Sequence, residues 1–272
     1  MNTRSNPKGT ALITGASAGM GALYADRLAR RGHDLILVAR DQKRLEALAA
    51  RITQETGRSV DVVVADLTVK ADLQRVEERL RSDAAISVLV NNAGFGSTAT
   101  LVDSDVDQLE SMIALNVTAL MRLSRAVAPA FVARGAGTIV NIASMVSLWP
   151  EVLNGTYSGT KAFVVNFTQS LHHELSGKGV QVQAVLPGAT RTDFWNTAGT
   201  PVAHLPQEIV MGAEELVDAA LAGLDQRELI TIPSLPDVAE WDAFNAARLA
   251  MQPKLSGTHA AARYKVAAPA KA

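Results

Sequence analysis

Cysteine is absent from this chain of 272 residues, and aromatic residues make up only 4% of it. The lack of cysteine excludes disulfides, thiol nucleophiles and cysteine-based zinc sites, and it suits a reducing cytoplasm. The five histidines do not show the spacing of a metal-binding motif. The sequence therefore predicts no metal site.

Neither sign of charge dominates, because 26 Lys and Arg residues accompany 27 Asp and Glu residues. A net charge of -1 gives no electrostatic reason to expect nucleic acid or an anionic membrane as a partner. No apolar run approaches the ~18 residues of a membrane helix, and residues 1–9 lack the apolar segment of a signal peptide. We therefore expect a soluble, cytoplasmic protein that acts on a small molecule.

Strand-like and helix-like segments alternate along most of the chain. Seven short apolar segments predict strands, at residues 10–14, 34–39, 60–65, 86–91, 138–143, 180–186 and 229–232. Near-continuous apolar runs such as 35–38 are typical of strands that are buried on both faces. The sequence predicts one doubly wound α/β domain over residues 1–252, a seven-stranded parallel sheet with helices on both faces. Its ligands are expected at the carboxyl edge of the sheet.

Two segments depart from this alternation. Residues 191–212 contain Pro201 and Pro206 and show no clean period, and we expect them to form a mobile lid at the ligand site. Residues 253–272 end in Ala-Ala-Pro-Ala-Lys-Ala and are predicted to be a low-complexity tail.

A glycine-rich loop, TGASAGMG at residues 14–21, joins the first predicted strand to the first predicted helix. Gly15 suits a tight turn, Gly19 lets the backbone approach a pyrophosphate, and Gly21 allows close packing of helix on strand. The N-terminus of the helix would face the phosphates and favour their negative charge. The loop therefore predicts a dinucleotide cofactor.

The end of the second strand bears on the choice between NAD(H) and NADP(H). An acidic residue there would bind the ribose 2′-hydroxyl, but Ala39 holds this position and Arg40 follows it. A guanidinium pairs with a 2′-phosphate, so NADP(H) is favoured over NAD(H). The hydroxyl of Ser17 can bind the same phosphate, or Ser17 can be an ordinary turn residue. Asp41 can accept a ribose hydroxyl or cap the helix that follows.

Tyr157 and Lys161 stand four residues apart near the start of a predicted helix, thirteen positions after Ser144. Side chains at this spacing share one helical face, so the ammonium can sit beside the phenol. A neighbouring cation favours the phenolate and lowers a tyrosine pKa from its reference value of ~10. Tyr157 can then exchange a proton with a carbonyl or alcohol oxygen.

Taken together, these motifs resemble the short-chain dehydrogenase/reductase family over residues 8–232. The matching segments are TGASAGMG at 14–21, Asp66-Leu67, NNAG at 91–94, Asn116, Ser144, Tyr157 with Lys161, and Pro187-Gly188 with Thr190 and Thr192. The resemblance implies a Rossmann fold and hydride transfer between a nicotinamide and a carbonyl carbon.

The resemblance also implies a role for each matching residue. Ser144 would polarise the substrate oxygen and Tyr157 would transfer the proton. Lys161 would hold the nicotinamide ribose and lower the pKa of Tyr157, and Asn116 would support a water relay. Ser147 is a nearby hydroxyl, but only Ser144 keeps the spacing of the family. The expected cofactor contacts are Gly15, Ser17, Gly19, Met20, Gly21, Arg40, Asp66, Leu67, Asn91, Ala93, Gly94, Tyr157, Lys161, Pro187, Gly188, Thr190 and Thr192.

Apolar residues in the loops at the predicted active edge indicate a hydrophobic substrate pocket. They are Phe95, Met145, Trp149, Phe194 and Trp195, and ordinary packing beneath a lid is the alternative interpretation. No basic cluster beyond Arg191 lies in these loops, so the sequence favours a neutral ketone, aldehyde or secondary alcohol. Acyl-carrier and fatty-acyl ketones remain open as alternatives.

Two further expectations follow from the helix that carries Tyr157 and from the complete set of motif residues. Phe163, Phe167 and Leu171 recur at helical spacing, which is consistent with core packing or with a subunit contact. Members of the family associate through this helix and the helix of Asn116, so the resemblance implies a homodimer or homotetramer. The alternative function is a non-catalytic NADP(H)-binding sensor on the same fold. The set of Asn116, Ser144, Tyr157 and Lys161 is intact, which favours an enzyme.

Overall fold

The computed structural model describes residues 8–265 of the chain. Two compact units divide the chain, Met1–Ser234 and Leu235–Ala272.

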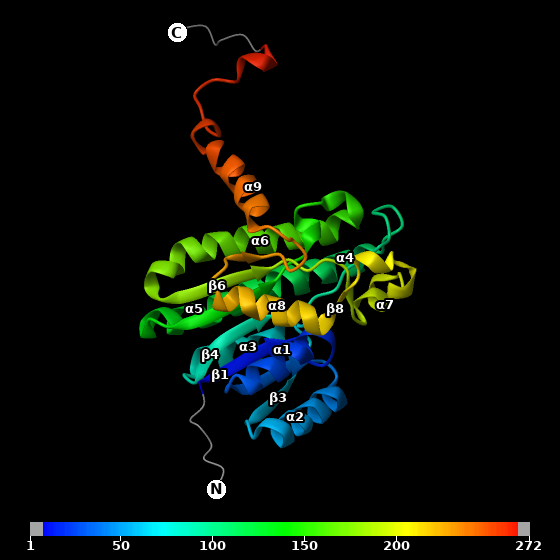
Figure 1. Cartoon of the computed structure of the whole chain (residues 1–272), viewed down its shortest axis with the longest axis vertical. Helices are drawn as coiled ribbons and strands as arrows, with labels where there is room; N and C mark the ends of the chain where they lie inside the picture. Colours follow the sequence, from blue (N-terminus) through cyan, green and yellow to red (C-terminus); the bar gives the residue numbers. More distant parts are fainter. Residues whose placement is uncertain (1–7, 266–272) are drawn as a thin grey trace. The chain divides into compact units, whose positions relative to one another are not determined.

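Seven parallel strands form the central sheet of the larger unit (Figure 1). Their spatial order is β3 (Val60–Val64), β2 (Asp34–Ala39), β1 (Thr10–Thr14), β4 (Ile86–Asn91), β5 (Gly137–Ile142), β6 (Val180–Val185) and β9 (Ile230–Thr231). Each observed strand agrees with its predicted range to within one residue at either end. The strand order reverses between β1 and β4, which is the switch point at which such sheets bind ligands.

Helices cover both faces of this sheet, which confirms the predicted doubly wound fold. They are α1 (Gly19–Arg30), α2 (Gln42–Thr56), α3 (Lys70–Ser82), α4 (Val106–Ile113), α5 (Leu120–Arg134), α6 (Gly155–Leu175) and α8 (Ala213–Asp225). Successive side chains of a strand point to opposite faces of the sheet. Ile13 of β1 accordingly packs in a core cluster with residues of α1, α2 and α8. Leu12 packs in a second cluster with residues of α3, α5 and α6.

Local sequence signals explain where α2 begins and ends. The carboxylate of Asp41 accepts a hydrogen bond of 3.0 Å from the backbone N–H of Arg44, so Asp41 caps the helix. Gly57 ends the helix in the left-handed region, with φ of 70°, which glycine adopts without steric cost. Asp41 thus serves as the helix cap, one of the two roles expected from its position.

The predicted lid, residues 191–212, has secondary structure of its own. It contains α7 (Phe194–Ala198) and two short 3-10 turns, Val202–His204 and Gln207–Ile209. Two strands of two residues each, β7 (Thr190–Arg191) and β8 (Met211–Gly212), pair in parallel at its ends. This pairing ties the two ends of the lid to each other.

The smaller unit is built around α9 (Val238–Ala250), which is capped by the side chain of Asp237. None of the 13 residues of α9 is buried. The predicted domain over residues 1–252 includes both the larger unit and α9. In the predicted tail, Gln252–Lys254 and Ala262–Tyr264 form single 3-10 turns, and residues 266–272 lie outside the described residues.

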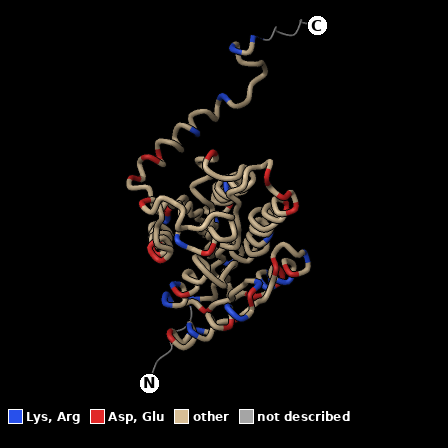
Figure 2. Tube along the Cα trace, turned by 90° about the vertical axis from the view of Figure 1, so that its right-hand side faces the viewer, with Lys and Arg blue, Asp and Glu red and all other residues tan. Residues whose placement is uncertain are grey.

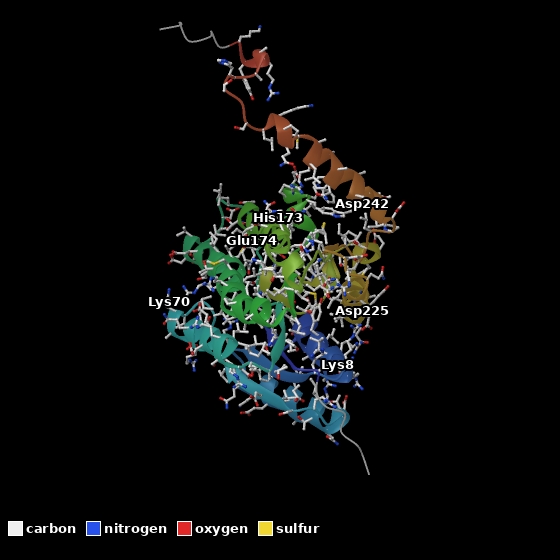
Figure 3. All side chains as sticks on the ribbon, turned by 90° about the vertical axis from the view of Figure 1, so that its left-hand side faces the viewer. Lys8, Lys70, His173, Glu174, Asp225 and Asp242 are labelled. Atoms are coloured by element: carbon white, nitrogen blue, oxygen red, sulfur yellow. The ribbon has the colours of Figure 1, made fainter. Side chains whose placement is uncertain are left out.

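Charged residues of both signs are interspersed over the larger unit (Figure 2). Side chains such as Lys70, Glu174 and Asp225 lie exposed at its periphery (Figure 3). Within residues 8–265, no helix combines the length and apolar character needed to cross a membrane. The same residues contain no cluster of three or more His, Asp or Glu side chains that could hold a metal ion.

Candidate active site

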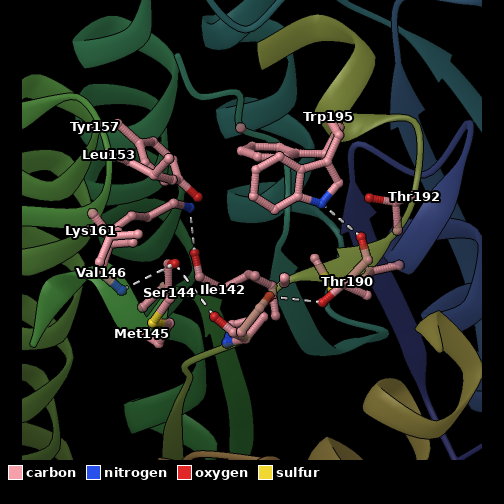
Figure 4. Close-up of a pocket in the computed structure, with 18 of the residues that line it drawn as sticks. Ile142, Ser144, Met145, Val146, Leu153, Tyr157, Lys161, Thr190, Thr192 and Trp195 are labelled. Carbon is pink, nitrogen blue, oxygen red and sulfur yellow. Dashed lines mark hydrogen bonds between the residues drawn. The ribbon is translucent and has the colours of Figure 1, made fainter. Parts of the chain in front are cut away.

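Tyr157 and Lys161 lie one turn apart in the first part of α6, and each side chain is buried. The Nζ atom of Lys161 lies 5.8 Å from the centre of the Tyr157 ring. It donates a hydrogen bond of 2.8 Å to the backbone carbonyl of Ile142, the last residue of β5 (Figure 4). The helix thus places the phenol and the ammonium side by side, and β5 fixes the position of the ammonium.

Ser144 follows β5 directly and reaches the same site. Its hydroxyl donates to the carbonyl of Pro187 and accepts from the N–H of Val146, each at 3.4 Å (Figure 4). The side chain of Ser144 acts to lower the pKa of Tyr157, against the larger effect of burial. Ser147 instead donates to the carbonyl of Ser144 at 2.7 Å.

Burial sets the protonation of the Tyr157 and Lys161 pair. It raises the pKa of Tyr157 to about 12, with the Ser144 hydrogen bond opposing it, and lowers the pKa of Lys161 to about 8. The sequence predicts that the pKa of Tyr157 is lowered. This prediction is wrong, because the pKa is raised in the structure. Exclusion of water disfavours the charged form of both groups. At neutral pH the pair holds a phenol, which is the proton-donating form.

Asn116 lies in a π-helical segment, Ala114–Ala119, between α4 and α5. Its amide donates to the carbonyl of Phe95 at 2.9 Å and to the hydroxyl of Thr160 at 3.1 Å. Its side-chain oxygen accepts from the N–H of Phe95 at 3.1 Å. Such π-helical insertions are frequent at functional sites, because they turn a side chain out of the regular helical face. Through these hydrogen bonds, Asn116 connects the loop that follows β4 with the part of α6 next to Lys161.

A groove of about 1020 Å³ lies at the carboxyl edge of the sheet. Among the residues expected to contact a cofactor, it is lined by Gly15, Ser17, Gly19, Met20, Arg40, Asp66, Leu67, Ala93, Gly94 and Thr192. Gly15 and Gly19 adopt positive φ values of 65° and 53°. A Cβ atom on Gly21 would lie 2.2 Å from the carbonyl oxygen of Gly15, so the turn requires glycine here. The open glycine turn and its helix N-terminus fit a dinucleotide.

Three ion pairs, formed by Arg40 and Arg44, lie along this groove. Arg40 is 80% exposed, and its guanidinium is 4.0 Å from the carboxylate of Asp66. Arg44 contacts both Asp41, at 3.5 Å, and Asp193 at the start of the lid, at 3.6 Å. Arg44 and Asp193 are groove residues that the motifs did not indicate, because neither belongs to a recognisable pattern.

Asn91, one of the expected cofactor contacts, is not among the residues that line this groove. Its side chain is buried in the sheet and donates to Ser124 at 3.0 Å and to Asn141 at 2.9 Å. The strand alternation turns Asn91 inward, and Asn92 lines the groove instead.

A second cavity, of about 340 Å³, adjoins the groove and contains the chemistry-bearing residues (Figure 4). Its lining includes the predicted residues Ser144, Met145, Tyr157, Lys161, Pro187, Gly188, Thr190, Thr192, Phe194 and Trp195. The ring of Phe194 lies 5.7 Å from that of Tyr157 and 5.4 Å from that of Trp195, centre to centre. The indole N–H of Trp195 donates to the carbonyl of Thr190 at 3.0 Å, which fixes the indole at the cavity wall.

Two expected pocket residues lie elsewhere. Trp149 is 58% exposed and does not line the cavity, because the 3-10 turns after Ser144 direct it to solvent. Phe95 lines the cofactor groove rather than the substrate cavity. Lining residues that the sequence did not indicate are Thr98, Val152, Leu153, Thr200, Leu205 and Ile209. They come from irregular segments, where no periodic pattern identifies the face that a side chain presents.

Comparison with known proteins agrees with this geometry. The family model for short chain dehydrogenase matches residues 9–202. The chain belongs to the short-chain dehydrogenase/reductase family of oxidoreductases, as its motifs predict.

Solved structures from two bacteria match nearly the whole chain. A short-chain dehydrogenase from Sphingobium yanoikuyae in complex with NADPH is 54% identical, with a TM-score of 0.91, and the match covers 94% of this chain and 100% of that one. A bulky-bulky ketone specific alcohol dehydrogenase from Comamonas testosteroni is 47% identical, with a TM-score of 0.87, over 94% of this chain and 98% of that one.

A human relative is longer than this chain. The 17-beta-hydroxysteroid dehydrogenase type 3 of Homo sapiens is 34% identical over 215 residues, which are 78% of this chain. The match spans 66% of the human protein, less than two thirds of its length.

Proposed function

We propose that this protein is an NADP(H)-preferring oxidoreductase that interconverts a hydrophobic ketone or aldehyde and the corresponding alcohol. One observation carries the proposal: Ser144, Tyr157 and Lys161 line a single cavity that adjoins a glycine-rich groove. The groove fits a dinucleotide and the cavity provides a proton donor.

In the proposed reduction, a nicotinamide held in the groove would supply a hydride to the carbonyl carbon of the substrate. The hydroxyl of Ser144 orients the carbonyl oxygen of the substrate toward the phenol of Tyr157. Tyr157 then gives its proton to that oxygen, which becomes the alcohol, and the phenol becomes a phenolate. The ammonium of Lys161, 5.8 Å from the ring centre, stabilises the phenolate electrostatically. Asn116 holds the loop at Phe95 against α6 and so keeps this arrangement rigid.

Preference for NADP(H) rests on Arg40. Its guanidinium lines the groove, is 80% exposed, and approaches Asp66 only at 4.0 Å. It is therefore available to a 2′-phosphate, with which a guanidinium forms strong charge-assisted hydrogen bonds. The NADPH complex of the Sphingobium relative supports this assignment.

The cavity lining supports a substrate with large apolar groups. Met145, Leu153, Phe194 and Ile209 line it together with Trp195. Such walls bind apolar groups and leave Ser144 and Tyr157 to recognise the single polar oxygen. The ketone specificity of the Comamonas relative supports a ketone with bulky groups on both sides of the carbonyl.

The proposal extends to assembly and location. Phe163 on α6 is 36% exposed and stacks on Phe167, with ring centres 5.7 Å apart. This apolar surface supports a homodimer or homotetramer, as expected from the sequence.

The lack of cysteine supports a cytoplasmic location.

In the first experiment, the purified protein is mixed with each of a panel of bulky ketones and aldehydes. The oxidation of NADPH, and in parallel that of NADH, is followed by absorbance. We expect turnover with NADPH and a kcat about a thousandfold lower in Tyr157→Phe, because the proton donor is lost. In Arg40→Ala the KM for NADPH should rise about tenfold, because charge-assisted contacts to the 2′-phosphate are lost. The KM for NADH should change little.

Tyr24→Phe is the matched control for the tyrosine variant. Tyr24 is fully buried, lines neither cavity, and its hydroxyl has no hydrogen-bond partner within the described part of the chain. This variant should keep its activity. Activity that survives in Tyr157→Phe would contradict the mechanism, and preference for NADH would contradict the role of Arg40. NADPH binding without turnover of any substrate would favour the non-catalytic sensor.

A further inference from the structure

Asn154 immediately precedes α6 and is buried, with 4% of its surface exposed. Its side-chain oxygen accepts from the N–H groups of Thr156, at 2.9 Å, and Tyr157, at 3.4 Å. Its amide donates to the carbonyl of Ala99, at 2.8 Å, and to the hydroxyl of Ser104, at 3.2 Å. One side chain therefore caps the helix of Tyr157 and also binds the loop that precedes α4.

This pattern uses the full hydrogen-bonding capacity of an asparagine side chain. The amide has two N–H donors and a carbonyl oxygen with two lone pairs, and all four have partners here. A helix cap requires only the acceptor, which Ser, Thr or Asp supplies equally well. The two donated bonds therefore serve something other than the start of the helix.

The donated bonds lead to the lid. Ala99 follows Thr98, whose N–H and hydroxyl both donate to the carbonyl of Ala198, at 2.9 and 3.0 Å. The hydroxyl of Thr200 donates to that of Thr98 at 3.0 Å. Ala198 and Thr200 lie at the end of α7, in the lid. Hydrogen bonds and one stretch of backbone thus connect the lid through Thr98 and Asn154 to the N–H of Tyr157.

We propose that Asn154 is a positioning residue that holds the first turn of α6 and the lid in a fixed relation through the loop at residues 97–105. The position of the lid over the cavity and the orientation of the proton donor are then set together. The kinetic part of this inference rests on the proposed function, because it takes Tyr157 as the proton donor. The structural coupling does not depend on it.

The test separates the cap from the coupling. In Asn154→Ser the cap is retained, because serine is as good a helix cap as asparagine, while the donors to Ala99 and Ser104 are lost. We expect kcat with a bulky ketone to fall about tenfold or more, since small misplacements of a catalytic group are costly. The dissociation constant for NADPH should stay close to that of the wild type, and the midpoint of thermal unfolding should fall by only a few degrees, as expected for the loss of two hydrogen bonds. Ser104→Ala keeps the bond from Asn154 to Ala99 but removes the bond from Asn154 to Ser104 and the bond that Ser104 donates to the carbonyl of Thr100, at 2.6 Å, and it should cause a smaller fall in kcat.

Hydrogen exchange measured by mass spectrometry provides a readout that needs no turnover. In Asn154→Ser the exchange of residues 97–105 and of residues 194–200 should rise severalfold, while the later turns of α6 remain protected. Asp105→Ser is the matched control, because Asp105 caps α4 through the N–H of Asp107, at 2.8 Å. This variant exchanges one cap for another in the same loop and should leave kcat and the exchange of the lid unchanged.

The outcomes are distinct. A kcat in Asn154→Ser within twofold of the wild type, together with unchanged exchange in the lid, would overturn the positioning role. An equal fall in kcat in Asp105→Ser would also overturn the positioning role. Any substitution in or next to this loop would then lower kcat, whether or not it removes the bonds that Asn154 donates. If the wild type turned over no ketone, the proposed function would fail, while increased exchange of residues 194–200 in Asn154→Ser would still support the coupling.

Discussion

Lys161 carries its ammonium group at a position from which water is largely excluded. Burial lowers its pKa to about 8, whereas an unfolded lysine has a pKa of ~10.4. Between these values the unfolded chain binds more protons at this position, so the free energy of unfolding rises with pH across this window. Below pH 8 the full cost of burying the charge applies. The residue thus lowers stability at neutral pH at the place where chemistry needs a cation.

Replacing the charge should therefore stabilise the fold. Lys161→Met is expected to raise the free energy of unfolding at pH 7 by about 1–2 kcal/mol, after allowance for the lost bond to Ile142. The gain should shrink toward pH 10, where the wild-type lysine is neutral when folded. Urea unfolding at the two pH values measures the difference. Turnover of ketones should be lost in the same variant.

Lys178→Met is the control for this comparison, because Lys178 is exposed at the end of α6. Lys178→Met removes the same ammonium group from a solvated position. It should not raise the free energy of unfolding in a way that depends on pH. If Lys161→Met were less stable than the wild type at pH 7, the bond to Ile142 would outweigh the cost of burying the charge.

The loop between β4 and α4 must pass very close to the catalytic helix, and Gly96 makes this possible. A Cβ atom at this position would lie 2.7 Å from the ring of Phe194 and 3.1 Å from that of Tyr157. The backbone of Gly96 does not require a positive φ, so the effect of alanine there comes from contact alone. Gly96→Ala is expected to displace one of the rings and to lower kcat about tenfold. Steady-state kinetics and urea unfolding, measured together, test this.

Gly159→Ala provides the same chemical change two residues beyond Tyr157. A Cβ atom there meets nothing within 4 Å, and the residue lies inside α6. This variant should keep its kcat and gain about 0.5–1 kcal/mol of stability, because alanine favours a helix more than glycine does. Equal kinetic losses in the two variants would mean that contact with the rings is not the cause.

Regular elements were predictable from the sequence and irregular ones were not. The strands and the glycine turn follow from period, composition and turn chemistry, which act over a few residues. β7 and β8 have two residues each and so carry no period. The bond from Asn154 to Ala99 joins residues 55 positions apart, and local pattern does not reveal such a contact. Trp149 and Met145 lie in one loop, but only Met145 lines the cavity, and the direction of each side chain depends on the 3-10 turn at Met145–Ser147.

At the scale of the whole molecule, the described chain divides unequally between a unit with a large core and a helical unit without one. The two main core clusters consist of residues from the larger unit. In α9, by contrast, Val238, Phe244 and Leu249 are 58%, 52% and 48% exposed. Stability that arises from burial of apolar area should therefore reside in residues up to Ser234.

Ending the chain after Ser234 should consequently change the free energy of unfolding by no more than about 0.5 kcal/mol, as is usual for exposed positions. Leu221→Ala in the full chain provides the contrast, because Leu221 is 2% exposed in α8 and its truncation should cost about 2–5 kcal/mol. Urea unfolding at several protein concentrations measures both. A shortened chain as unstable as Leu221→Ala would mean that α9 buries its apolar side chains in solution. If that loss were larger at higher protein concentration, the surface that buries them would belong to a second copy of the chain, because stability gained by association depends on concentration.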